Sequence, residues 1–195
     1  MLTDVIVLNG GSSSGKSSIA RGLQSVLDAP WLTFGVDTLI DAMPRSMQRV
    51  DAGLSFQPDG EITVGPAFRQ LEAAWYQGLA AMVRAGAKVI VDEVFLGGAG
   101  SQARLRAALD GLRVLWVGVH CDRVVAAARE GARHDRARPE LSSRGDQSPV
   151  GMAALQVDLV HDGVVYDLEV DTTHTAAVDC ARVIAARILA SDPMT

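Results

Sequence analysis

The sequence has few cysteines and no long uninterrupted apolar run. Only 2 of its 195 residues are cysteine, Cys121 and Cys180, and neither lies in a CxxC or Cys/His spacing. This excludes a disulfide scaffold and a structural zinc site, and it predicts a reduced, cytoplasmic compartment. No stretch approaches the roughly 18 apolar residues of a membrane span, and the apolar run near the start is too short for a signal peptide. We therefore expect no association with a membrane.

Positive charge and aromatic residues are also scarce. The chain has 18 Lys+Arg against 23 Asp+Glu, a formal net charge of -5, and its aromatic content is 5%. Non-specific nucleic-acid binding needs a strong positive field, and basic patches interleaved with aromatic residues are missing. We expect no nucleic-acid partner, although a local basic cluster can still hold one phosphorylated small molecule.

The length predicts a single domain over residues 1–195, because domains run to roughly 100–200 residues and no linker or internal repeat interrupts the chain. A hydrophobic content of 48% is enough for a sizeable core. The sequence is compatible with a homo-oligomer and does not fix the number of copies.

Apolar runs alternate with segments of helical periodicity along most of the chain. Continuous apolar runs of this kind are typical of strands buried on both faces of a parallel sheet. The predicted strands are Val5–Leu8, Trp31–Gly35, Lys88–Asp92, Val114–Val119 and Val164–Val170, and the main predicted helices start near Lys16, Pro66, Gln102, Asp122, Met152 and Thr175. This order predicts an α/β fold with three layers, a parallel five-stranded sheet carrying helices on both faces.

Two segments stand apart from this alternation. Residues 51–65 hold a Pro-Asp-Gly turn between two alternating runs, which predicts a hairpin. Residues 134–150 are polar, with arginines, serines and two prolines, and we interpret them as a lid-like loop. Ligands of open parallel sheets lie beyond the carboxyl ends of the strands, so the loops there are where chemistry is expected.

A phosphate-binding loop follows the first predicted strand and precedes the first predicted helix. Its residues fit G-x-x-x-x-G-K-[ST] and are Gly10, Gly11, Ser12, Ser13, Ser14, Gly15, Lys16 and Ser17, with Ser18 next to them. Glycines let the backbone N–H groups turn toward phosphate oxygens, Lys16 reaches the β- and γ-phosphates, and Ser17 coordinates Mg²⁺. The loop therefore predicts a P-loop kinase-like fold with ATP and Mg²⁺ as cofactors.

A second metal ligand is expected at the end of the third strand. Val89, Ile90 and Val91 form an apolar run that ends in Asp92, the place where P-loop enzymes hold a carboxylate near Mg²⁺. The alternative is an aspartate that caps the following turn. Glu93 is a weaker candidate, because neighbouring strand residues point to opposite faces.

Asp37 follows the second strand at the same edge of the sheet as the phosphate loop. A carboxylate there can accept the proton of a hydroxyl that attacks the γ-phosphate. An N-cap for a helix over Leu39–Met43 explains the aspartate equally well, so the residues alone leave the two interpretations open.

Four arginines occupy the end of one predicted helix and the start of the lid-like loop: Arg129, Arg133, Arg136 and Arg138. Guanidinium groups suit phosphate oxygens, and Arg133 and Arg136 are the candidates to contact the transferring phosphoryl group. Surface ion pairs with Glu130 and Asp135 are the alternative.

Taken together, these residues resemble the chloramphenicol phosphotransferase family of P-loop enzymes, which transfer the γ-phosphate of ATP to a hydroxyl of chloramphenicol. The matching strings are Leu8–Ser17, Phe34–Asp37, Ala42–Pro44, Val91–Gly98, Leu115–Val119, Tyr166–Asp167 and Val170–His174. The resemblance implies Asp37 as the catalytic base and Arg133 and Arg136 as lid arginines. The segment Ala137–Val150 is longer than the family's compact lid, which leaves the acceptor open.

The expected function is therefore ATP-dependent O-phosphorylation of a small hydroxylated acceptor, with chloramphenicol first and antibiotic resistance as the consequence. Two alternatives remain: a kinase for another hydroxylated antibiotic or metabolite, and a nucleotide-binding regulatory module that transfers no phosphate.

Overall fold

The computed structural model describes residues 3–44, 47, 54–56, 62–134 and 152–190. A parallel sheet of five strands forms the centre, in the order β2-β5-β1-β6-β7. Its strands are β1 (Val5–Asn9), β2 (Trp31–Gly35), β5 (Lys88–Glu93), β6 (Val114–His120) and β7 (Leu168–Asp171). The predicted parallel five-stranded sheet is confirmed.

The central strands form because their side chains are apolar on both faces. Val5, Ile6, Val7 and Leu8 of β1 are all 0% exposed. β1 pairs with β5 on one side and β6 on the other, with Leu8 opposite Asp92. This register brings the carboxyl ends of β1 and β5 together at one edge of the sheet.

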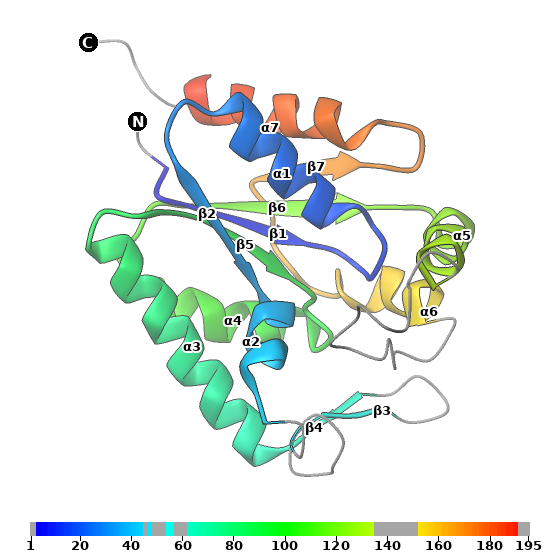
Figure 1. Cartoon of the computed structure of the whole chain (residues 1–195), viewed down its shortest axis with the longest axis horizontal. Coiled ribbons are helices and arrows are strands. Elements are labelled where there is room, and N and C mark those ends of the chain that lie inside the picture. Colours follow the sequence, from blue (N-terminus) through cyan, green and yellow to red (C-terminus); the bar gives the residue numbers. More distant parts are fainter. Residues whose placement is uncertain (1–2, 45–46, 48–53, 57–61, 135–151, 191–195) are drawn as a thin grey trace.

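Helices cover both faces of the sheet (Figure 1). They are α1 (Lys16–Val26), α2 (Val36–Ala42), α3 (Pro66–Arg84), α4 (Gly98–Ala108), α5 (Arg123–His134), α6 (Met152–Leu159) and α7 (Ala177–Ala190). One apolar core lies between the sheet and α1 with α7, and a second lies between the sheet and α3 with α4. The three-layer prediction is confirmed, and α5 and α6 lie beyond the carboxyl ends of β1 and β6 (Figure 1).

Two predicted boundaries, the start of one helix and the start of one strand, are each wrong by four residues. The helix expected from Gln102 already begins at Gly98, in a Gly-Ala-Gly-Ser stretch that carries no apolar periodicity. The strand expected from Val164 begins only at Leu168. The Gln102 side chain binds both backbone groups of Val165, at 2.6 Å and 3.0 Å, so these groups are not available to a sheet ladder.

The predicted hairpin is present as a separate two-stranded antiparallel pair, β3 (Leu54–Phe56) and β4 (Ile62–Val64). It lies near α2 and the start of α3 (Figure 1). The lid-like segment lies outside the described residues, apart from His134 at the end of α5. Within the described part of the chain, no helix has the length and apolar character needed to cross a membrane.

Candidate functional site

The phosphate-binding loop adopts a left-handed turn just before α1. Gly15 is the N-cap of α1 with φ 94°, a conformation that glycine adopts without steric cost. Ser13 also has a positive φ, 59°. The loop is closed by a hydrogen bond from Ser14 N–H to the Gly11 carbonyl, 3.3 Å long. This geometry sets up an anion-binding site at the N-terminus of α1.

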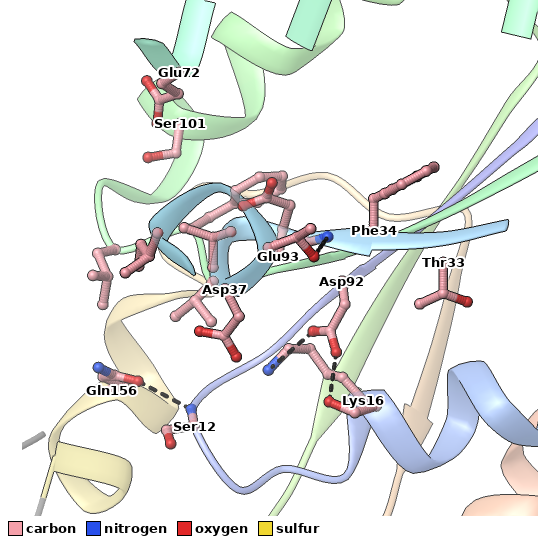
Figure 2. A pocket seen from close by; sticks show the side chains of 18 of the residues that line it. Ser12, Lys16, Thr33, Phe34, Asp37, Glu72, Asp92, Glu93, Ser101 and Gln156 are labelled. Atoms are coloured by element: carbon pink, nitrogen blue, oxygen red, sulfur yellow. Dashed lines mark hydrogen bonds and ion pairs between the residues drawn. The ribbon is translucent and has the colours of Figure 1, made fainter. Parts of the chain in front are cut away.

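Lys16 and Asp92 lie side by side at the edge of the sheet (Figure 2), and Ser17 contacts Asp92 there. The Lys16 Nζ donates to the Gly11 carbonyl at 2.9 Å and lies 3.7 Å from Asp92 Oδ1. The Ser17 hydroxyl donates to Asp92 Oδ2 at 2.7 Å. These three side chains place one cation and two hard oxygen ligands beside the loop, a set that suits a phosphate-bound Mg²⁺.

Thr172, the first residue after β7, is hydrogen bonded to the phosphate loop. The Thr172 hydroxyl donates to the Ser14 carbonyl at 2.7 Å. Arg129 in turn donates to the Thr172 carbonyl at 2.7 Å and to its hydroxyl at 3.1 Å. Of the four arginines singled out in the sequence, Arg129 is therefore connected to the phosphate loop through Thr172. Arg136 and Arg138 lie outside the described residues, as does the side chain of Arg133, whose backbone is in the last turn of α5.

Asp37 is an exposed residue in the first turn of α2, directly after β2. The N-cap position belongs to Gly35, so the helix begins at Val36 and the N-cap alternative for Asp37 does not hold. Figure 2 shows the Asp37 carboxylate on the same side of the site as Lys16 and Ser12. It is therefore positioned to face a group bound on the loop.

A cavity of about 680 Å³ connects these side chains. One end is the phosphate loop with Lys16 and Ser17, and Asp37, Asp92 and Gln156 also line it. The other end is lined by residues of β2, α2, α3, the end of β5, the segment after it and α4: Phe34, Ile40, Phe68, Arg69, Glu72, Tyr76, Glu93, Phe95 and Ser101. The cavity thus joins a phosphate-binding end to a larger end of mixed apolar and polar character.

Asp92 and Glu93 lie on opposite faces of β5 and still border the same cavity. Asp92 faces α1 and the loop, whereas Glu93 is 3% exposed on the side of α3, where Tyr76 lies. Burial raises the pKa of Glu93 to about 8, with the nearby charges of Asp92 and Glu72 adding to it and the Val94 N–H opposing it. Burial, together with Glu93 and Glu72, also raises the pKa of Tyr76.

One oxygen of Glu93, Oε1, is buried without a hydrogen-bond partner among the described residues. Glu72 of α3 also lines this end of the cavity. It is 9% exposed and accepts hydrogen bonds from two guanidinium groups. Its Oε2 accepts from Arg69 at 2.9 Å and from Arg104 at 3.0 Å. The broad end of the cavity therefore offers one carboxyl oxygen without a hydrogen-bond partner among the described residues and one carboxylate that is paired with two guanidinium groups.

Two features of the site had no clear signal in the sequence. Gln156 of α6 accepts a hydrogen bond from the Ser12 backbone N–H, and no motif marks it. A second cavity of about 270 Å³ lies on the other side of the loop, between Arg129 and the segment Thr172–Ala177.

The Phe34 ring, which lines the large cavity, is packed against Trp75. The two rings are in edge-to-face contact, with their centroids 5.9 Å apart.

No group of three or more His, Cys, Asp and Glu side chains in the described ranges could hold a metal ion by protein ligands alone. Mg²⁺ in nucleotide sites is held by one or two protein oxygens together with phosphate oxygens, so the Ser17 and Asp92 pair fits such a site.

The model of the chloramphenicol phosphotransferase-like family matches residues 3–189. Two curated proteins of Mycobacterium tuberculosis, from strains CDC 1551 and H37Rv, are each 30% identical to this chain over 190 residues, which cover 91% of this chain and 79% of the relative. Both have provisional names as O-phosphotransferases.

Solved structures share the fold. Shikimate kinase from Acinetobacter baumannii, solved with shikimate, aligns with a TM-score of 0.60 at 21% identity over 98% of this chain and 96% of its own. The tunicamycin resistance protein of Deinococcus radiodurans aligns with a TM-score of 0.59 at 20% identity over 95% of both chains. A gluconokinase from Sinorhizobium meliloti aligns with a TM-score of 0.55 at 17% identity over 98% of both chains. The architecture is that of the P-loop kinases.

Proposed function

The chain belongs to the chloramphenicol phosphotransferase-like family, and on this basis we propose that it is a cytoplasmic enzyme that transfers the γ-phosphate of ATP to a hydroxyl of a small molecule, with chloramphenicol as the first candidate acceptor. The observation that carries the proposal is the single cavity that contains Lys16, Asp92 and Asp37 at one end and a mixed apolar wall at the other. Phosphorylation of that hydroxyl adds charge and bulk to the antibiotic, which is a route to resistance.

The nucleotide phosphates are assigned to the loop. The N–H groups between Gly10 and Ser18 and the Lys16 ammonium offset the phosphate charge. Ser17 and Asp92 would hold Mg²⁺ together with phosphate oxygens, and the ion would supply positive charge to the phosphates during transfer. The second cavity, bordered by Arg129 and Thr175, is assigned to the rest of the nucleotide, because it adjoins the loop at Gly15 and Ser18.

Asp37 is assigned as the base. The acceptor oxygen forms a bond to the γ-phosphorus, and its proton passes to the Asp37 carboxylate. The bond between the γ-phosphorus and the bridging oxygen of the β-phosphate breaks, and ADP leaves. Lys16 stabilises the negative charge of the transferred group throughout, and Arg133 and Arg136 are assigned to the same group from the lid.

The broad end of the cavity is assigned to the acceptor. Phe34, Phe68 and Phe95 supply an apolar wall, and Glu93 Oε1 supplies a polar atom with no other partner among the described residues. A partly apolar molecule that carries hydroxyl groups, which both donate and accept hydrogen bonds, matches this surface, since ligand sites are mostly apolar with a few placed polar groups. Chloramphenicol has this character.

Mass spectrometry of chloramphenicol incubated with the purified protein, ATP and Mg²⁺ tests the proposal. We expect the mass of the antibiotic to rise by that of one phosphate group, and Lys16→Ala to slow this gain by at least about 10²-fold. A panel of other hydroxylated antibiotics and metabolites is run alongside. Transfer to another panel member alone would keep the kinase and replace the acceptor, whereas nucleotide binding without transfer to any of them would favour the regulatory alternative.

A further inference from the structure

Gln156 connects α6 to the phosphate loop. Its Oε1 accepts a hydrogen bond from the Ser12 backbone N–H at 3.0 Å, across 144 positions of sequence. The side chain is well buried, at 7% exposure, and it lines the large cavity. Figure 2 shows it opposite Ser12, on the side of the cavity where the Asp37 carboxylate points. Gln156 therefore borders the end of the loop that faces Asp37.

Other contacts fix α6 against the same loop. Asn9, the last residue of β1, donates from Nδ2 to the Val160 carbonyl at 2.7 Å. A Cβ placed on Gly11 would lie 3.4 Å from both N and Cα of Val157, so the helix backbone packs directly on the loop. The backbone that carries Gln156 is therefore held against the loop, and its carboxamide lies next to the loop N–H groups.

The hydrogen bond also fixes how the carboxamide is oriented. Ser12 N–H is a donor, so the oxygen of Gln156 must face it, and the Nε2 group, with two N–H donors, points elsewhere. Backbone N–H groups of such a loop are phosphate ligands. A neutral amide oxygen thus occupies, in this structure, the kind of position that a phosphate oxygen takes on the loop.

We infer that Gln156 is a catalytic residue that contacts the γ-phosphate. On binding of ATP, Oε1 releases the Ser12 N–H to a γ-phosphate oxygen, and Nε2 donates to the same phosphoryl group. Once the phosphoryl group has moved to the acceptor and ADP remains, Oε1 returns to the Ser12 N–H. The inference rests on the proposed function, since it assigns a further residue to the same phosphoryl-transfer site.

This role predicts that Gln156 distinguishes ATP from ADP, which a purely structural contact would not do. The test compares the dissociation constants of ADP and of a non-hydrolysable ATP analogue, measured calorimetrically with Mg²⁺. Gln156→Glu retains an oxygen for Ser12 but places a carboxylate beside the γ-phosphate. Gln156→Met retains the volume of the side chain and removes both hydrogen-bonding groups. Gln77→Glu introduces the same charge at an exposed position of α3 and is the matched control.

We expect Gln156→Glu to weaken binding of the ATP analogue by about tenfold or more while ADP changes by less than about threefold. Gln156→Met is expected to weaken the analogue by about three- to tenfold with the same selectivity, and Gln77→Glu to leave both constants unchanged. Equal weakening of both nucleotides, or no change in either variant, would overturn the role assigned to Gln156. Failure of the unaltered protein to bind either nucleotide would instead contradict the proposed function, and the inference with it.

Discussion

Ser17 and Asp92 are hydrogen bonded to each other, with 2.7 Å between Ser17 Oγ and Asp92 Oδ2, although 75 positions separate them in the sequence. The sheet causes this contact. Asp92 is opposite Leu8 of β1 and Gly35 of β2, so it lies at the carboxyl edge where the phosphate loop leaves β1. The two expected Mg²⁺ ligands are therefore held together by the fold.

Loss of either ligand is expected to raise the Mg²⁺ requirement of phosphoryl transfer. Ser17→Ala and Asp92→Asn each remove one oxygen ligand or its charge. The Mg²⁺ concentration for half-maximal transfer should rise by about tenfold or more. Titration of the transfer rate with Mg²⁺ measures this, and Ser25→Ala, on α1 away from the loop, is the control. Unchanged Mg²⁺ dependence in both variants would remove these residues from the metal site.

Lys16→Ala is expected to reduce kcat/KM for transfer by about 10²–10³-fold, because its ammonium is assigned to stabilise the charge of the transferred phosphoryl group. The side chain is 6% exposed and contacts the Gly11 carbonyl. A steady-state assay measures the loss, and circular dichroism shows whether the fold survives. A folded variant with normal turnover would show that the loop does not bind the reacting phosphates.

Gly35→Ala is expected to destabilise the protein by about 1–3 kcal/mol. Its φ of -165° is accessible to any residue, so the cause is lack of space. A Cβ there would lie 2.3 Å from the Asp92 carbonyl oxygen, which requires β2 and β5 to separate. Transfer should fall as well, because this movement shifts Asp37 relative to Asp92.

The matched control is Gly78→Ala in α3, where an added Cβ meets nothing within 4 Å. This change should stabilise the protein by about 0.5–1 kcal/mol, since alanine favours a helix interior. Urea unfolding of both variants gives the comparison. Equal shifts for the two would contradict the close approach at Gly35.

Asp4 is expected to give the protein a stability that is lost in acid. A hydrogen bond from Arg113 lowers the pKa of Asp4 to about 2, with burial opposing and Lys88 assisting. The folded pKa is below the ordinary value of 3.8, so the stabilisation is complete above about pH 4 and is lost as the pH falls toward 2.

Asp4→Asn should therefore lower the free energy of unfolding by about 1 kcal/mol at pH 7, because the ion pairs are partly exposed. Urea titrations at pH 7, 4 and 2 should show this difference shrinking as the pH falls. A difference that stays constant over this range would mean that the charge of Asp4 is not responsible.

The local part of the site could be predicted from the sequence. The phosphate loop and Asp92 are marked by short-range patterns, namely a glycine-rich motif and an apolar run that ends in an acid, and the structure brings them together. The strands could be predicted for the same reason, since continuous apolar runs are local signals.

Features that depend on distant contacts could not be predicted. Gln156 contacts Ser12 only because α6 packs on the loop, and Arg129 reaches it only through Thr172. The raised pKa of Glu93 follows from its burial at the end of β5 and from the nearby charges of Asp92 and Glu72. The late start of β7 depends on the side chain of Gln102, which binds the backbone of Val165 from 63 positions away. None of these contacts leaves a pattern in the nearby sequence.

The central claim is that Asp37 accepts the proton of an acceptor hydroxyl as that hydroxyl takes the γ-phosphate of ATP. The most direct test is the rate of phosphate transfer by Asp37→Asn, with the dissociation constant for Mg-ATP measured on the same preparation. We predict that kcat falls by about 10²–10⁴-fold while the dissociation constant changes by less than about threefold. An Asp37→Asn variant that transfers phosphate at the unaltered rate would contradict the account.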